Sequence, residues 1–290
     1  MQGWRSLLFL AANDTARMAK VHLRGADAVI LDLEDAVPQH AKKEARHCAP
    51  GHIAALHALR QDVLVRINRD WRSALADLEA VLQPGLKGLV LPKVEDAGRL
   101  RSMMEMILEF TAERRLGEPA IIAMVESPAS FQALDTISAV PGLTGIALGS
   151  EDFALALGVA PTPECLDLPC RMLALAAARH GLMSLGMPLP IADFHNEAAF
   201  AQAAARGRQM GLTGALCIHP RQVGAVNAAF SPSAAEMAWA LRVVRAFERT
   251  GTGVATLDGH MLDRPVLLRA SRLIEASAKP SDLREQARQP

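Results

Sequence analysis

Eight short apolar runs, separated by longer segments rich in alanine, leucine, arginine and glutamate, constrain the fold of this chain more than any other feature. Their hydrophobicity is continuous rather than alternating, which is typical of strands buried on both faces in a parallel sheet. The runs are RSLLFL (5–10), DAVILDLED (27–35), DVLVRIN (62–68), KGLVLPKV (87–94), AIIAMVES (120–127), LTGIALGSED (143–152), GLMSLGMPLP (181–190) and GALCIHP (214–220). Eight strand–helix units predict an α/β fold, the (β/α)8 TIM barrel.

The intervening segments fit helices. Residues 73–85 show helical apolar spacing and end in Pro-Gly, and residues 196–211 end at a glycine. We expect the barrel to occupy residues 1–225. We expect residues 226–290 to form a C-terminal helical extension or lid that could contribute to a neighbouring subunit's site.

In this extension, a helix should begin at the capping box Ser233–Glu236 and stop at Gly251. An extended turn over 254–265 and a second helix over 266–279 should follow. The polar residues 280–290 should be frayed.

Composition excludes several classes of protein. The chain carries 31 basic and 31 acidic residues, so it has no electrostatic footprint for nucleic acid. No apolar segment approaches the roughly 18 residues of a membrane helix, and the N-terminus lacks a signal-peptide layout. The four cysteines match no zinc or redox spacing, which favours reduced thiols. We therefore expect a soluble, cytoplasmic protein without nucleic-acid or membrane partners.

Polar residues follow the apolar part of nearly every run. In a TIM barrel the chemistry lies at the carboxyl ends of the strands, so these side chains should converge on one rim. The residues are Asp32, Glu34, Asp35, Arg66, Asn68, Lys93, Glu126, Asp152 and His219. Convergence of so many charged groups is difficult to explain by solvation alone.

Glu126 and Asp152 follow neighbouring strands and are the candidate metal ligands. An all-oxygen site suits Mg²⁺, which takes one or two carboxylates and keeps waters for the substrate to displace. The acids of the second run, Asp32, Glu34 and Asp35, would then orient metal-bound water.

Arg66 offers a planar fork of donors suited to a carboxylate or a developing enolate oxygen. Structural alternatives stay open for several of these residues. Asp35 could cap a helix, Asp152 could be a helix N-cap, Glu126 a turn residue and Arg66 an ion-pair partner, while Lys93 and His219 favour structural roles.

An ordered series of motifs covers roughly residues 5–275 and carries a resemblance. The motifs are RSLLFL, GADAVILDLEDAVP, VRIN, LPKVE, MVESP, ALGSEDFALALG, CIHPRQV, FSPS and LDGHMLDRPV. Together they resemble the citrate lyase β-subunit-like branch of the HpcH/HpaI aldolase superfamily. This resemblance implies a (β/α)8 fold, Mg²⁺ as cofactor, a homotrimer or hexamer, and an acyl-CoA or acyl-carrier thioester as substrate.

The resemblance also implies roles for individual residues. Glu126 and Asp152 would bind the metal, and Arg66, together with Glu126, would contact the substrate. Asp263, in GHMLDRP, is similar to a catalytic aspartate that some members present from an adjacent subunit. It could instead cap the helix that follows it.

The reaction implied is Mg²⁺-dependent cleavage of a 3-hydroxy-3-carboxyacyl-CoA, of the citryl, citramalyl or malyl type, to acetyl-CoA and a 2-oxo acid. Two alternatives remain open. One is a malyl-CoA-type thioesterase. The other is a citrate lyase-like subunit that acts on a carrier-protein thioester.

Overall fold

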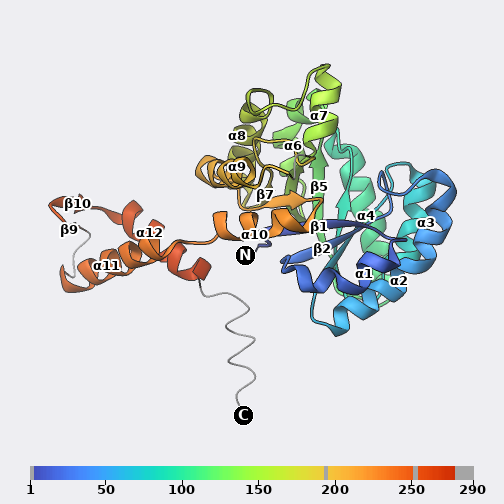
Figure 1. Cartoon of the computed structure of the whole chain (residues 1–290), viewed down its shortest axis with the longest axis horizontal. Coiled ribbons are helices and arrows are strands. Elements are labelled where there is room, and N and C mark those ends of the chain that lie inside the picture. Colours follow the sequence, from blue (N-terminus) through green and yellow to red (C-terminus); the bar gives the residue numbers. More distant parts are fainter. Residues whose placement is uncertain (1–2, 193–194, 251–253, 278–290) are drawn as a thin grey trace, which may run out of the picture. The chain divides into compact units, whose positions relative to one another are not determined.

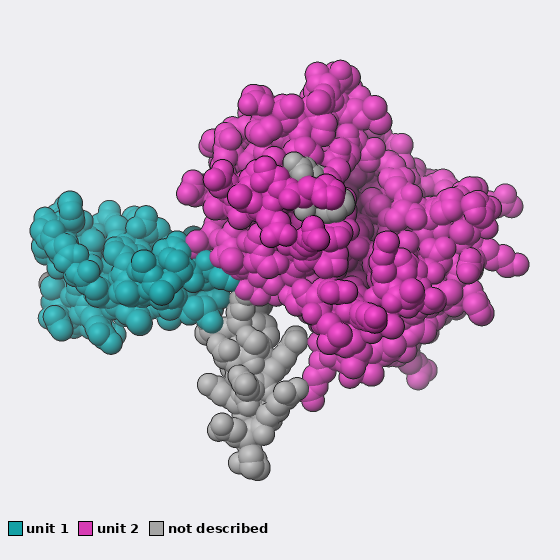
Figure 2. All heavy atoms as spheres, in the orientation of Figure 1, with its two compact units in different colours: residues 1–2, 231–290 teal, residues 3–230 magenta. Residues whose placement is uncertain are grey.

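The computed structural model describes residues 3–192, 195–250 and 254–277. It contains two compact units, Gly3–Phe230 and the segment from Ser231 onward (Figure 2). The division follows helix α10 (Pro220–Ala229), whereas the boundary expected at residues 225 and 226 lies inside it. The expected frayed segment 280–290 lies outside the described residues.

The first unit is a barrel of eight parallel strands, which confirms the predicted fold class. The strands are β1 Ser6–Ala11, β2 Ala28–Asp32, β3 Asp62–Arg66, β4 Leu86–Leu91, β5 Ala120–Val125, β6 Leu143–Leu148, β7 Met183–Leu185 and β8 Ala215–Cys217. Their order is β7-β6-β5-β4-β3-β2-β1-β8. A bridge between Leu185 and Gly214 joins the two ends of the sheet.

Helices surround these strands (Figure 1). They are α1 Thr15–Val21, η1 His22–Arg24, η2 Gln39–Ala41, α2 Lys42–Ala58, α3 Trp71–Val81, α4 Ala97–Glu113, α5 Pro128–Gln132, α6 Leu134–Ser138, α7 Ser150–Leu157, α8 Pro163–His180, α9 Glu197–Met210 and α10. None of the helices in the described residues has the length and apolar character needed to cross a membrane.

Side chains on each strand alternate between two buried layers. Leu7, Ile30 and Leu64 belong to the cluster inside the barrel. Leu8 and Leu31, their chain neighbours, pack in the layer beneath the helices. Because successive residues of a strand point to opposite faces, both faces must be apolar, and the runs read as continuous.

The strands end earlier than the runs suggested. β2 ends at Asp32, so Glu34 and Asp35 lie in the loop beyond it. β6 ends at Leu148, and Asp152 lies in the first turn of α7. The polar residues therefore begin where strand pairing stops, at the rim of the barrel.

The second unit is built from α11 (Ala234–Thr250), β9 (Ala255–Leu257), β10 (His260–Leu262) and α12 (Arg264–Ser277). The expected capping box is confirmed, because Ser233 N–H donates to Glu236 Oε2 at 2.7 Å and Glu236 N–H to Ser233 Oγ at 3.2 Å.

The extended turn expected over 254–265 is instead an antiparallel hairpin. Asp258 and Gly259 join its strands with positive φ angles of 52° and 79°. An Asp-Gly pair favours this kind of tight turn, so the sequence held the signal.

Candidate active site

The carboxyl ends of the barrel strands open onto a cavity of about 910 Å³. The predicted site residues that line it are Asp32, Asp35, Arg66, Glu126 and Asp152. Glu34 is buried beside them. The barrel therefore brings candidate residues of four different runs to one end of the fold.

Asp32 holds Arg66 in one orientation. The Arg66 guanidinium donates to both oxygens of Asp32, at 2.8 and 2.5 Å. The same two oxygens accept the N–H groups of Glu34, at 2.9 Å, and Ala36, at 3.0 Å. Arg66 also lies over the Phe9 ring, with its guanidinium carbon 4.8 Å from the ring centroid. These contacts fix the guanidinium beside the cavity.

Burial alone would lower the pKa of Arg66, but the hydrogen bond and charge of Asp32, with Glu34 and Asp35, raise it above its ordinary value. The guanidinium is therefore a permanent positive charge in the site.

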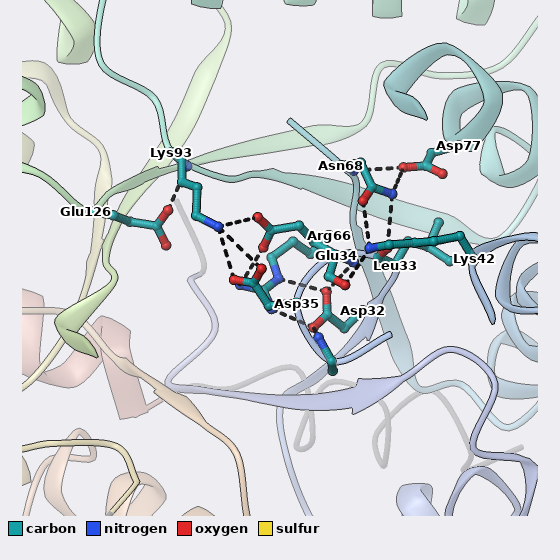
Figure 3. A network of polar contacts seen from close by, with 11 residues as sticks. Asp32, Leu33, Glu34, Asp35, Lys42, Arg66, Asn68, Asp77, Lys93 and Glu126 are labelled. Carbon is teal, nitrogen blue, oxygen red and sulfur yellow. Dashed lines mark hydrogen bonds and ion pairs between the residues drawn. The ribbon is translucent and has the colours of Figure 1, made fainter. Parts of the chain in front are cut away.

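The acidic loop after β2 has two cationic partners. Lys93 Nζ lies 2.7 Å from Glu34 Oε1 and 3.2 Å from Asp35 Oδ2, and Arg66 Nη1 lies 3.1 Å from Glu34 Oε2 (Figure 3). Burial raises the pKa of Glu34 despite these cations. For Asp35, the hydrogen bond with Glu34 and the charge of Lys93 outweigh burial and lower the pKa.

Lys93 connects this loop to Glu126. Its backbone N–H donates to Glu126 Oε2 at 2.7 Å while its ammonium binds Glu34 and Asp35. Its φ of +51° lies in the left-handed region, which is uncommon for a residue other than glycine. Such conformations gather at functional sites. The sequence singled out Lys93 but could not reveal that it bridges three carboxylates.

Glu126 is only 3% exposed, and within the described residues it forms no ion pair. Burial, then the charges of Asp152 and Glu34, raise its pKa to about 7. Gly149 leaves room for this carboxylate, because a Cβ at that position would lie 2.3 Å from Glu126 Oε1. Among the described residues, Glu126 is therefore a packed carboxylate without an ion-pair partner.

Two structural alternatives are wrong. Gly149 is the N-cap of α7, so Asp152 does not cap it. Asp35 caps neither η2, whose N-cap is Pro38, nor α2, whose N-cap is Ala41.

Glu126 and Asp152 give the cavity an oxygen-only donor pair. No group of three or more His, Cys, Asp or Glu side chains in the described part of the chain is arranged to hold a metal ion. Such a pair suits Mg²⁺, which needs few protein ligands and completes its shell with water and substrate oxygens.

A basic strip also lines the cavity and was not predicted. It consists of Arg17, Lys20 and Arg24, from α1 and η1. Their spacing of three and four residues along a helical segment could have indicated one shared face. His219 also lines the cavity, and its Nδ1 accepts the N–H of Arg221 at 3.2 Å, which fits its expected structural role.

Asp263 belongs to the second unit. Its carboxylate accepts the N–H of Val266 at 3.3 Å, at the start of α12. This is the contact expected of a helix cap. The catalytic role implied by the resemblance stays a prediction.

Comparison with known proteins identifies the lineage of this barrel. The family model described as HpcH/HpaI aldolase/citrate lyase matches residues 5–220. The chain belongs to the HpcH/HpaI aldolase/citrate lyase family. This membership confirms the resemblance read from the sequence and the expectation of a carbon–carbon lyase type of enzyme.

Relatives named as citrate lyase subunits and relatives named as thioesterases both match most of the chain. The citrate lyase subunit beta of Escherichia coli is 34% identical over 291 residues, which cover 97% of this chain and 95% of the relative. A (3S)-malyl-CoA thioesterase of Cereibacter sphaeroides is 32% identical over 266 residues, or 90% of each chain.

Among solved structures, CitE from Mycobacterium tuberculosis in complex with magnesium, acetoacetate and coenzyme A has a TM-score of 0.71 to this chain. It is 28% identical, and the match covers 96% of this chain and 100% of that one.

Proposed function

We propose that this family member cleaves a 3-hydroxy-3-carboxyacyl thioester, of the citryl, citramalyl or malyl type, to an acetyl thioester and a 2-oxo acid. The observation that carries the proposal is the meeting of Glu126, Asp152 and Arg66 at one cavity. The names of the E. coli and M. tuberculosis relatives support the same reaction.

Glu126 and Asp152 would hold Mg²⁺, since both line the cavity with carboxylate oxygens and a cation would relieve the repulsion by which Asp152 raises the pKa of Glu126. When bound, Mg²⁺ supplies Lewis-acid polarisation of the substrate's hydroxyl and adjacent carboxylate. Asp32 already accepts four hydrogen bonds. Ordering of water near the cation would therefore fall to Glu34 and Asp35.

The remaining chemistry belongs to Arg66 and Asp263. As the substrate hydroxyl gives its proton to water, from which Asp263 takes up the proton it later donates, the hydroxyl oxygen becomes a carbonyl, the carbon–carbon bond breaks, and the electron pair moves onto the thioester as an enolate. Arg66, fixed by Asp32, would stabilise the negative oxygen. Asp263 would protonate the enolate carbon, which completes the acetyl thioester.

The basic strip of Arg17, Lys20 and Arg24 supports a carrier that bears phosphate groups, such as coenzyme A. The coenzyme A bound to the M. tuberculosis relative agrees with this choice. We propose that the chain works as a homotrimer or hexamer, as the resemblance implies, and that it is cytoplasmic, as its cysteine spacing favours.

Two other activities have support among the relatives. A malyl-CoA-type thioesterase is favoured by the C. sphaeroides protein, and would release free hydroxy acid and CoA without a 2-oxo acid. A citrate lyase-like subunit is favoured by the name of the E. coli relative. Such a subunit, acting on a carrier-protein thioester, would be inactive on CoA thioesters alone.

The test of the metal ligands uses Glu126→Ala and Asp152→Ala. Each should abolish Mg²⁺-dependent release of the 2-oxo acid, while Glu109→Ala, an exposed acid on α4, should retain it. Retained cleavage in both site variants would contradict the proposal.

A further inference from the structure

A second lysine, Lys42, binds the acidic loop through the loop's backbone carbonyls. Lys42, the first residue of α2, donates from Nζ to the carbonyl oxygens of Leu33, at 2.7 Å, and Glu34, at 2.6 Å, and to Asn68 Oδ1 at 2.8 Å. An ammonium group has three hydrogens, so all of them are used. Lys42 and Lys93 thus hold the same loop through different groups (Figure 3).

A buried frame made of Asn68, Asp77 and Arg46 holds the side-chain oxygen of Asn68 that orients Lys42. The Asn68 side-chain amide donates to Leu33 O at 2.9 Å and to Asp77 Oδ2 at 2.7 Å. The backbone N–H of Asn68 donates to the same Asp77 oxygen. Asp77 is fully buried, and Arg46 donates to its other oxygen at 2.6 Å. The Asn68 side-chain amide is therefore held in one orientation, which fixes the oxygen that Lys42 binds.

The contacts of Lys42 have consequences inside the cavity. Lys42 binds the backbone carbonyl of Glu34, while the carboxylate of the same residue pairs with Lys93 and Arg66. The Glu34 N–H is also held against Asp32, the residue that fixes Arg66. A continuous set of hydrogen bonds thus joins Lys42 to Arg66.

We propose that Lys42 is a positioning residue for Arg66. Lys42 acts through the carbonyls of Leu33 and Glu34. The role of Arg66 in this proposal rests on the proposed function. Without the Lys42 ammonium, two loop carbonyls lose their donor and the loop can relax. Asp32 and Arg66 would shift with it, and a misplacement of about 1 Å can cost roughly 100-fold in rate.

The first test compares Lys42→Met with Lys43→Met, an exposed neighbour on α2. On the thioester that the wild type cleaves, Lys42→Met should lower kcat by about 10- to 100-fold and raise KM by up to about 10-fold. Lys43→Met should match the wild type. Equal kcat values in the two folded variants would overturn the proposal.

A second measurement separates positioning from folding. Ethylammonium chloride should restore part of the kcat of Lys42→Ala, while tetramethylammonium chloride, which has no N–H donor, should not. Lack of rescue by ethylammonium in a folded Lys42→Ala protein would contradict a role through the ammonium group.

Binding provides a readout that does not need turnover. Pyruvate, titrated calorimetrically with MgCl2 present, should bind Lys42→Met about 10-fold more weakly than Lys43→Met. If the wild type cleaves no thioester but this difference appears, the proposed function fails while the positioning role stands. Equal pyruvate affinity in the two variants would overturn the positioning role.

Discussion

Glu126 is buried beside other carboxylates, and that environment sets the pKa of its carboxyl group. Burial, Asp152 and Glu34 raise its pKa from 4.5 to about 7. A raised pKa in the folded chain contributes stability that is fully present below 4.5 and is lost as pH rises through about 7. The melting temperature of the metal-free protein should therefore fall between about pH 5 and pH 8.

A thermal unfolding series with and without MgCl2 checks this dependence. Glu126→Gln has no carboxyl proton to lose at this position, so its melting temperature should fall less over the same range. MgCl2 should raise the melting temperature of the wild type most strongly at the high end of this pH range, where the Glu126 carboxylate is ionised. Superimposable pH profiles for the two proteins would contradict this account.

Gly149 is required because it lies against Glu126. Its backbone is not in the left-handed region, so Gly149→Ala tests contact alone: the added Cβ would lie 2.3 Å from Glu126 Oε1. Displacement of this carboxylate should lower activity about 100-fold. Gly51→Ala, in open space within α2, should keep full activity and gain up to about 1 kcal/mol of stability. Equal activity of both variants would argue against a fixed Glu126.

At the scale of the elements, the strands could be predicted because burial on both faces leaves continuous apolar runs. The contacts of the charged residues could be predicted only in part. The sequence left Arg66 open as an ion-pair partner, but it did not show that Arg66 and Lys93 pair directly with Asp32, Glu34 and Asp35. These partners come from other strands, and their side-chain directions depend on tertiary packing. The Asp77 frame was missed for the same reason, since a single Asp in a helical pattern gives no periodic signal.

Asp77 ties α3 to α2 and to the end of β3. Its carboxylate is fully buried and accepts from Arg46 and twice from Asn68. Asp77→Ala should lower the free energy of unfolding by about 3 kcal/mol, because it leaves buried donors unpaired. Glu79→Ala, exposed on the same helix, should stay within about 0.5 kcal/mol of the wild type in denaturant titration. A loss below about 1 kcal/mol for Asp77→Ala would show that the frame is dispensable.

At the scale of the whole molecule, Asp263 belongs to the C-terminal unit while the other proposed residues belong to the barrel. The resemblance implies that a neighbouring subunit can supply it. Glu126→Ala and Asp263→Asn should each be inactive alone. Their co-expression as mixed oligomers should recover activity, because one interface would then carry both intact groups. Mixed oligomers without activity would contradict supply from a neighbour.

The most direct test of the account is a product analysis of the wild-type chain. Citryl-, citramalyl- and malyl-CoA are each incubated with MgCl2, and acetyl-CoA, 2-oxo acid, free CoA and hydroxy acid are quantified by chromatography. We expect equimolar acetyl-CoA and 2-oxo acid from at least one substrate, and neither product in the presence of EDTA. Release of free CoA and hydroxy acid without a 2-oxo acid, or cleavage that EDTA leaves unchanged, would contradict it.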